Sequence, residues 1–414
     1  MKALEEVVIV GGARTPVGSY LGGLKTVDEP MLGEIALNEA IKRSGINKED
    51  IEEVIVGNVT GSQTSNNVGN LIGINVGLPA TTTGMTINRI CGSGFQSIIS
   101  ASQEIKLGDA EVVAAGGVES LSRAPFYLPI EARYDGLKMG NKPLIDANVA
   151  GHSSASGRDS GIDHMGNTAE AVARKWNITR ERQDQFAFDS QMKCKAAMES
   201  GRLAEEIVPV EIKGRKGQVT VVDTDEFPKP GTTVENLAKL KPVFEKDGTV
   251  TAGNASGLND GGAFSIVTSA SYAEKHGLTV WAKVVDYKVA GVEAEYMGMG
   301  PVPAIKALLE RNGLDLQKDV GILEINEAFA AQQVACLDEL GVDMNSEWYK
   351  NSYNPNGGGI SMGHPLGASG ARIMVSILQE FKNHPEYKYG IGSACIGGGM
   401  GVAILVENGF HSAE

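Results

Sequence analysis

The chain has 414 residues, and 37 basic against 51 acidic side chains give it a formal charge of −14. This acidic balance argues against non-specific binding to nucleic acid or to an anionic membrane. The length predicts two or three domains, and a hydrophobic content of 42% excludes disorder as the main state. Glycine contributes 53 residues, about 13% against an ordinary ~7%, which predicts many tight turns or close backbone approaches.

The cysteines and the apolar runs indicate the cellular compartment of the protein. Four cysteines in so long a chain form neither a disulfide framework nor a metal-ligand spacing, which predicts free thiols in a reducing compartment. The N-terminal residues lack the basic region and long apolar core of a signal peptide. No run reaches the roughly 18 apolar residues of a membrane span. We therefore expect a cytoplasmic protein with no membrane, nucleic-acid or metal partner.

Short apolar runs alternate with helical patterns in the first third of the chain. They predict a strand at 7–10, a helix at 33–44, a strand at 54–56, a helix at 93–107 and a strand at 111–115. Such alternation is typical of an α/β domain with a largely parallel sheet.

The residue composition changes in the middle of the chain. Loops rich in Arg, Tyr, Pro and Lys surround a predicted helix at 180–200, which indicates an inserted, partly irregular loop domain at 121–249 that covers the substrate. The remaining residues divide into an N-terminal half, 1–120 with 250–277, and a C-terminal half, 278–414.

The two halves repeat the same order of signals. In 43–56 and in 311–324, a helix stopped by glycine leads through an acidic stretch into a buried strand. Cys91-Gly-Ser-Gly and His364-Pro-Leu-Gly-Ala-Ser-Gly each open a predicted helix. The repeat predicts two copies of one α/β unit, each with a reactive side chain where a loop meets a helix. Coincidence between two ordinary connections is the alternative.

Cys91 and His364 are the first candidates for chemistry. A thiol at the start of a helix lies at the positive end of its dipole, which favours the thiolate, and the adjacent glycines allow close substrate approach. His364 also precedes a helix, where a neutral imidazole is favoured and can act as a general base. A buried structural cysteine and a surface histidine are the alternatives. The glycines around His364 lack the pattern of a nucleotide-binding loop.

Cys395 and Asn326 are the second pair of candidates. Three glycines, 397–399, follow Cys395 closely, and their bare N–H groups could form an oxyanion hole. A tight hairpin with a buried thiol is the alternative. Asn326 stands between a predicted strand and a predicted helix, where it could cap the helix or orient a water. We interpret Cys194 and Cys336, which lie inside amphipathic helical patterns, as structural.

Five motifs in order over the whole chain resemble the thiolase family, most closely its acetyl-CoA C-acetyltransferases (acetoacetyl-CoA thiolases). They are Asn88-Arg-Ile-Cys-Gly-Ser-Gly, Asn254-Ala-Ser-Gly-Leu-Asn-Asp-Gly, Asn326-Glu-Ala-Phe-Ala, Gly363-His-Pro-Leu-Gly-Ala-Ser-Gly-Ala-Arg and Cys395-Ile-Gly-Gly-Gly-Met-Gly. The resemblance implies an α/β fold in which two repeated halves form a five-layered αβαβα core with an inserted loop domain. It also implies a homotetramer or a homodimer.

The resemblance further implies a reaction in two steps. In thiolases the residue matching Cys91 is acylated by an acyl-CoA, and the residue matching His364 takes the thiol proton. The residue matching Cys395 then deprotonates a second acetyl-CoA, whose carbanion attacks the acyl group to give acetoacetyl-CoA. His364 with a water held by Asn326 would form one oxyanion site, and the N–H groups of Cys91 and Gly397 the other. Thiolysis is the reverse, and the only cofactors implied are the coenzyme A thioesters themselves.

Substrate positions are implied in the same way. Ser256 matches a contact to the pantetheine arm of CoA. Lys229 stands where the family often places an Arg against the adenine, and a lysine lacks the flat guanidinium that stacks on a base. The residues that match a short, closed acyl pocket, with ordinary core residues as the alternative, are His164, Met165, Met297 and Phe329.

Three rival functions differ from this interpretation in specific residues. A β-ketoacyl synthase would place a histidine at position 326 and would not need Cys395. A non-catalytic acyl-CoA or lipid carrier of the same fold typically lacks a catalytic residue, whereas this chain has all four. A broad-range degradative 3-ketoacyl-CoA thiolase is the nearest competitor.

Overall fold

The N-terminal half is built on five strands in the order β4-β3-β5-β10-β1. The computed structural model describes residues 4–153 and 164–411. Strand β3 is parallel to β4 and β5, whereas β10 is antiparallel to both β5 and β1. The bounds are β1 Val7–Arg14, β3 Glu53–Gly57, β4 Thr83–Ile87, β5 Val112–Ser120 and β10 Asn259–Ser269, with the short β2 Gly18–Ser19 beside β10.

The C-terminal half repeats this arrangement with strands in the order β12-β13-β14-β11. Strand β12 is parallel to β13, and β14 is antiparallel to β13 and β11. A parallel bridge between Leu323 and Tyr353 takes the place of β4. The topology confirms the repeat predicted from sequence. The bounds are β11 Ala282–Gly291, β12 Val320–Ile325, β13 Tyr389–Ile396 and β14 Met400–Asn408.

The prediction of a largely parallel sheet is wrong. Strands β13 and β14 are joined through the glycines 397–399, and so short a hairpin can connect only antiparallel strands. Strand β1 pairs antiparallel with β10 and, through Val8 and Ile9, with β11. This short β1–β11 pairing joins the strands of the two halves into one mixed sheet of ten strands among the described residues, within which each half still forms its own β layer.

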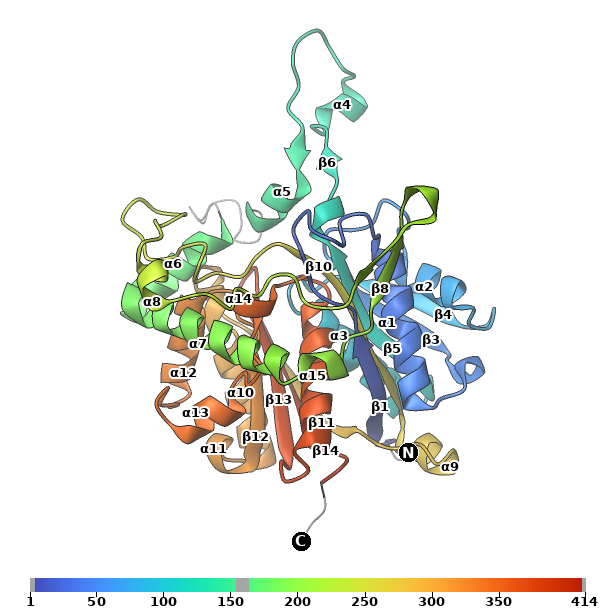
Figure 1. Cartoon of the computed structure of the whole chain (residues 1–414). Helices are drawn as coiled ribbons and strands as arrows, with labels where there is room; N and C mark the ends of the chain where they lie inside the picture. The colour runs from blue at the N-terminus through green and yellow to red at the C-terminus, as the bar shows by residue number, and fades with distance from the viewer. Residues whose placement is uncertain (1–3, 154–163, 412–414) are drawn as a thin grey trace.

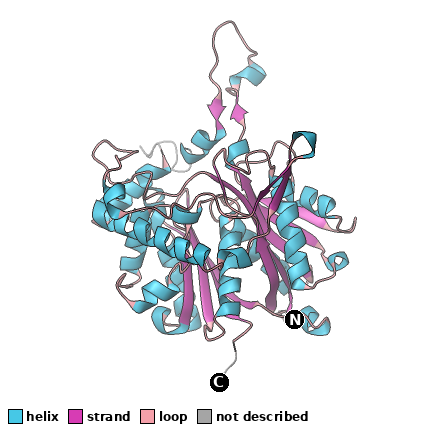
Figure 2. Ribbon diagram, viewed as in Figure 1, coloured by secondary structure: helices cyan, strands magenta, loops and turns pink. Residues whose placement is uncertain are grey.

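Helices form three layers, one on the outer side of each half and one between the strands of the two halves (Figure 1, Figure 2). Separate apolar cores lie on the outer side of each half, and a third surrounds the helices between the halves. The five-layered αβαβα arrangement is therefore confirmed. The outer helices are α1 Glu29–Ser44 and α2 Val68–Val76 on one side and α10 Pro301–Asn312 and α12 Ala330–Glu339 on the other, and the central helices are α3 Ser93–Leu107 and α15 Ser369–Asn383.

Helices α3 and α15 touch through their first turns because glycine stands at the contact. A Cβ atom on Gly94 would lie 2.5 Å from the backbone nitrogen of Ala371. A Cβ atom on Gly370 would collide with the backbone of Phe95 in the same way. Any larger residue would separate the two helix starts, and with them the loops that carry Cys91 and His364.

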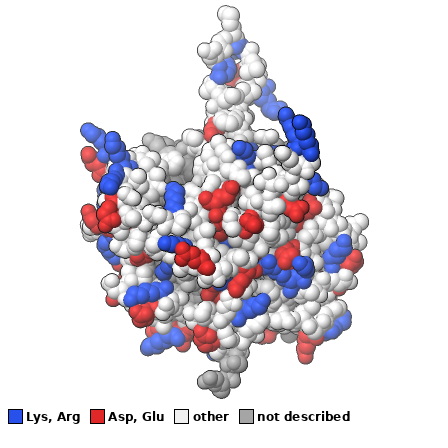
Figure 3. Space-filling model, in the orientation of Figure 1, with Lys and Arg blue, Asp and Glu red and all other residues white. Residues whose placement is uncertain are grey.

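The segment between β5 and β10 lies across one end of the sheets, and its hairpin β6–β7 projects as an arm (Figure 1). The arm exposes apolar side chains, among them Phe126, Leu128, Ile130 and Met139. Acidic and basic side chains are interspersed over the face in Figure 3, and most of the arm is uncharged. The segment contains β6 Phe126–Tyr127, α4 Glu131–Tyr134, β7 Ile145–Asp146, α5 Ala147–Ser153, α6 Met165–Lys175, α7 Arg180–Glu199, β8 Val210–Lys213, β9 Val219–Val222 and α8 Val234–Ala238.

Four short helices complete the fold: α9 Ala270–Lys275, α11 Leu316–Asp319, α13 Glu347–Ser352 and α14 Gly359–Met362. Among the helices described, none combines the length and the apolar character that crossing a membrane requires.

Buried ion pairs join β1, the inserted segment and α15. Arg14 is 1% exposed, and its Nε lies 2.6 Å from Glu206 while its Nη1 lies 2.7 Å from Asp225. Arg202 connects Glu206 to Glu380 of α15, at 3.0 and 2.5 Å. Burial works against the charged form of Glu206, but the two arginines outweigh it and hold the pKa of Glu206 at about 2.

We expect Arg14→Met to lower the free energy of unfolding by about 3–5 kcal/mol, because it leaves the buried Asp225 without its cation and removes one of the two arginines that pair with Glu206. Urea denaturation at neutral pH measures this loss. The matched control is Arg182→Met, which breaks a pair with Asp338 whose side chains are about 40% exposed. That control should cost about 1 kcal/mol or less. Equal losses for the two variants would contradict the importance of the buried pairs.

Candidate active site

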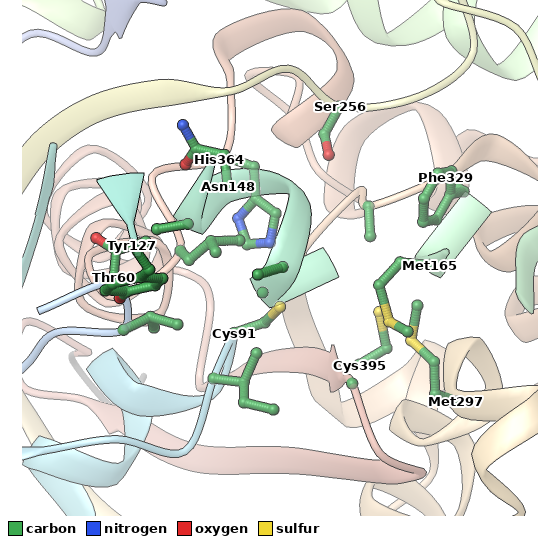
Figure 4. A pocket seen from close by; sticks show the side chains of 18 residues that line it. Thr60, Cys91, Tyr127, Asn148, Met165, Ser256, Met297, Phe329, His364 and Cys395 are labelled. Carbon is green, nitrogen blue, oxygen red and sulfur yellow. The ribbon is translucent and has the colours of Figure 1, made fainter. Parts of the chain in front are cut away.

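A cavity of about 350 Å³ is lined by residues of both halves and of the inserted segment (Figure 4). Cys91, His364, Cys395 and Gly397 all line it. They come from three connections: the turn between β4 and α3, the loop before α15 and the β13–β14 hairpin. The structure therefore brings together the reactive residues that the sequence motifs singled out. Asn326 lies directly behind them, against His364.

Cys91 sits in a turn held by its own neighbours. Ile90 adopts a φ of 48°, a strained value for a β-branched residue. The side chain of Asn88 accepts a hydrogen bond from the Ile90 N–H at 2.9 Å, and the hydroxyl of Ser93 donates to the Ile90 carbonyl at 2.7 Å. These contacts fix the turn and direct the partly exposed Cys91 into the cavity (Figure 4).

The environment of the Cys91 sulfur corrects one sequence expectation. The helix α3 does begin just after Cys91, but burial raises the pKa of the Cys91 thiol to about 11. Hydrogen bonds from the backbone N–H groups of Gly397 and Cys91 itself oppose this effect, and the negative charge of Glu119 adds to it. The free site therefore holds a thiol at neutral pH rather than the thiolate predicted from the helix start, and its reaction requires a base.

His364 is a buried residue, 3% exposed, which excludes the alternative of a surface histidine. Its Nδ1 lies 2.6 Å from the hydroxyl oxygen of Ser369, whose own proton goes to the Pro365 carbonyl at 2.9 Å. This pattern assigns the imidazole proton to Nδ1 and leaves a lone pair on Nε2. Its backbone N–H donates to the side chain of Asn259 at 2.9 Å, which fixes the loop.

Asn326 does not cap the helix that follows it. Helix α12 begins at Ala330 after Phe329, so the capping alternative is wrong. The Nδ2 atom of Asn326 lies 3.3 Å from Nε2 of His364. Its Oδ1 is buried, and among the residues described it accepts no hydrogen bond. Asn326 and His364 therefore form a polar pair, of which His364 lines the cavity.

Cys395 lies at the end of β13 and is fully buried, yet it lines the cavity. The hairpin after it turns through Gly398 and Gly399, both at φ near 85°. The motif is therefore a tight hairpin with a buried thiol, and its role in the reaction stays a prediction. Burial, together with the nearby Cys91, raises the pKa of Cys395 well above its usual range.

One wall of the cavity is apolar and comes from the predicted acyl-pocket residues. Met165, Met297 and Phe329 line it and pack in one cluster with Cys395 (Figure 4). His164 does not line the cavity. Its Nδ1 accepts a hydrogen bond from the Gly166 N–H at 3.0 Å at the start of α6. Its ring stacks on Phe244, whose edge packs against Phe329.

The two predicted CoA contacts lie in different cavities. Ser256 lines the cavity with Cys91, and its N–H donates to the Ala328 carbonyl at 2.9 Å. Lys229 lines a second cavity, of about 390 Å³, together with Thr232 and Asn236. The chain segment 252–256 runs from one cavity to the other.

Sequence reasoning missed the wall opposite the methionines. It is formed by Val59, Thr60, Ile90, Tyr127, Asn148 and Leu366. Ile90 and Leu366 stand inside recognised motifs, so their positions carried a signal that we did not use. Tyr127 and Asn148 come from the irregular inserted segment, where no motif or periodicity marks them.

The described residues hold no group of three or more His, Cys, Asp or Glu side chains placed to bind a metal.

We expect iodoacetamide to alkylate Cys91 first, because Cys194, Cys336 and Cys395 are buried. A pKa raised to about 11 leaves the thiolate as the minor form, so the rate should rise about tenfold per pH unit between pH 7 and 9. Mass spectrometry of labelled peptides measures this rate, and a Cys91→Ala variant controls for the other thiols. A rate that is already constant by pH 8 would contradict a raised pKa.

Comparison with known proteins places this site in a family. The models for the thiolase N-terminal and C-terminal domains match residues 7–271 and 278–408. An acetyl-CoA acetyltransferase of Cupriavidus necator is 46% identical over 98% of this chain and 100% of its own. The crystal structure of the acetyl-CoA acetyltransferase of Bacillus anthracis superposes with a TM-score of 0.92 at 41% identity, covering 99% of this chain and 100% of that one. The crystal structure of human mitochondrial 3-ketoacyl-CoA thiolase superposes with a TM-score of 0.91 at 42% identity, covering 98% of this chain and 99% of that one. The chain belongs to the thiolase family.

Proposed function

We propose that this chain is an acetyl-CoA C-acetyltransferase, which condenses two acetyl-CoA into acetoacetyl-CoA and CoA and catalyses the reverse thiolysis. The observation that carries the proposal is the apolar wall of Met165, Met297 and Phe329, packed on Cys395 at the reactive end of the cavity. Bulky side chains there leave room for a short acyl group. The curated relatives named acetyl-CoA acetyltransferase support the same assignment.

In the first step Cys91 is the nucleophile and His364 the base. The raised pKa of Cys91 makes a base necessary, and Nε2 of His364 carries the lone pair that can take the thiol proton. The sulfur attacks the thioester carbonyl, the acetyl group moves to Cys91, and CoA leaves with the proton that His364 returns. The site loses no proton over this step.

In the second step Cys395 passes its own proton to His364, which lines the same cavity, and as a thiolate takes a proton from the methyl group of a second acetyl-CoA. The carbanion attacks the carbonyl of acetyl-Cys91, and the Cys91 thiolate leaves and takes the proton that His364 holds. Backbone N–H groups of Cys91 and Gly397 would stabilise the charge on the acetyl oxygen, and Asn326 with His364 the charge on the enolate. Each such donor typically contributes about 3–4 kcal/mol of transition-state stabilisation. The Gly397 N–H already points at the Cys91 sulfur, which supports this role.

CoA thioesters are the substrates in this proposal, with no permanent cofactor. Ser256 contacts the pantetheine arm, and the nucleotide end lies in the second cavity beside Lys229. The Nζ of Lys229 lies 5.2 Å from the centroid of the Phe227 ring, so charge and an aromatic face are both available to that end. His164 supports the acyl wall through Phe244 rather than by direct contact.

A homotetramer is part of the same proposal, and the apolar side chains exposed on the β6–β7 arm support it, because a surface of that kind is covered in stable assemblies. The cytoplasmic location remains a prediction from the cysteine pattern.

Replacing either reactive thiol should abolish turnover while the fold remains. We expect Cys91→Ser and Cys395→Ser to lower kcat for thiolysis of acetoacetyl-CoA by at least about a thousandfold, because an alcohol is a far weaker nucleophile and acid than a thiol. Circular dichroism checks the fold. The matched control is Cys194→Ala, a buried cysteine outside the site, which should retain activity. A Cys91→Ser enzyme with near-native kcat would contradict the nucleophile assignment.

Chain length separates the proposal from a broad-range degradative 3-ketoacyl-CoA thiolase. We expect kcat/KM for CoA-dependent thiolysis to be at least about tenfold higher with acetoacetyl-CoA than with a six- or eight-carbon 3-ketoacyl-CoA, since the wall excludes longer tails. Met165→Ala or Met297→Ala should raise activity on the longer substrates. Comparable rates on all substrates would assign the broad-range activity instead, and no activity on any would favour a carrier.

A further inference from the structure

Glu119 is a buried carboxylate that the reaction described above does not use. It lies one residue before the end of β5 and is 0% exposed. It stands behind the cavity wall, where its contacts bridge the two halves of the chain. Five of the hydrogen bonds that it accepts define its role.

Four of these hydrogen bonds come from the N-terminal half, from the residues that follow β3. The Asn58 amide donates to Glu119 Oε1 at 3.2 Å, and the Val59 N–H donates to Oε2 at 3.1 Å. Thr60 donates to Oε1 twice, from its N–H at 3.1 Å and from its hydroxyl at 2.6 Å. Val59 and Thr60 then line the cavity on the side of Cys91.

The fifth hydrogen bond comes from the C-terminal half. The N–H of Gly367 donates to Glu119 Oε2 at 2.9 Å. Gly367 lies between His364 and Ser369, the residue that fixes the His364 imidazole. A Cβ atom on Gly367 would lie 2.8 Å from the carbonyl oxygens of both Gly57 and Val118, so this loop rests directly on the other half.

We propose that Glu119 is a positioning residue, which holds the His364 loop against the cavity wall beside Cys91 across the junction of the two halves. It touches no reacting atom, and although its charge adds to the raised pKa of Cys91, its hydrogen bonds act through the loop that carries His364. This inference rests on the proposed thiolase reaction.

A carboxylate is required at this point because every partner is a donor. A glutamine has nearly the same shape but brings an NH₂ group, which would face the N–H of Gly367 or of Thr60. One of those groups would then lose its acceptor in a buried place. Burial raises the pKa of Glu119 to about 7, while the hydrogen bonds from Thr60, Gly367 and Val59 oppose that rise. With a pKa of about 7 the carboxylate is the major form only above neutral pH, and an ionisable group kept in so buried a place supports a role beyond packing.

The first test is Glu119→Gln, assayed by thiolysis of acetoacetyl-CoA. We expect kcat to fall on the order of 100-fold, as for a displacement of about 1 Å between reacting groups, with KM for CoA changed less than about threefold. The matched control is Glu104→Gln. Glu104 also has a pKa raised to about 7 by burial, but it lies in the last turn of α3, at the opposite end of that helix from Cys91. The control should retain wild-type kcat.

A double-mutant cycle separates positioning from general stability. In a His364→Ala background, Glu119→Gln should change the residual kcat by less than about threefold, because the group that it positions is gone. An equal loss in both backgrounds would assign Glu119 a purely structural role and overturn the inference. Wild-type kcat in Glu119→Gln would overturn it as well.

A second pair of variants tests the same inference if the Glu119→Gln protein does not fold. Thr60→Val removes the hydrogen bond of 2.6 Å and keeps the shape, and Thr60→Ser restores the hydroxyl. We expect a severalfold lower kcat for the valine variant and recovery with serine; no difference between them would overturn the inference. If the wild-type protein cleaves no 3-ketoacyl-CoA, the proposed function fails, and the same four variants are compared by the rate at which iodoacetamide alkylates Cys91. Coupling between Glu119 and His364 then appears when Glu119→Gln changes that rate by different factors in the wild-type and His364→Ala backgrounds.

Discussion

The contact between the two halves, made by backbone against backbone, is the constraint on which the chemistry depends. At Gly94 and Gly370 the first turns of α3 and α15 meet with no room for a side chain. At Gly117, a Cβ atom would collide with the carbonyl of Gly367. Cys91 precedes one of these helices and His364 the other, so the spacing of the two halves also sets the distance between the proposed nucleophile and the proposed base. This geometry explains why glycine clusters accompany each reactive residue.

Burial has opposite consequences in different parts of the molecule. At Arg14 and Glu206 opposite charges are paired, so both groups stay ionised. At Cys91 and Cys395 burial is not balanced by a cation, and the pKa of each thiol is raised. The reactive thiols are therefore kept in their neutral form until a neighbouring group takes the proton. A helix start alone does not determine the ionisation of a thiol that lies so close to a protein core.

Much of the fold and of the reactive centre could be predicted from sequence, because both leave local signals. Helix α3 has the predicted bounds, and the helix stops at Gly45 and Gly313 have the expected positive φ. The antiparallel pairing was missed, since hydrophobic runs do not encode strand direction. Glu119 and Tyr127 were missed because their importance comes from distant partners. The division at residues 120, 249 and 277 stays a prediction, and 154–163 of the predicted loop domain lie outside the described residues.

The order of strands in the sheet has a consequence for how the chain folds as it is synthesised. Among the described residues, and apart from one bridge between Arg14 and Ile207, strand β1 has no strand partner until β10 emerges about 250 residues later, and its other neighbour is β11. Pairings so distant in sequence close large loops and form slowly. Cys395 follows Cys91, Asn326 and His364 in the chain, so it completes the site only after both halves have assembled. A nascent chain of this protein therefore exposes apolar strand edges for longer than a chain built from local contacts, and such edges are sites where aggregation begins.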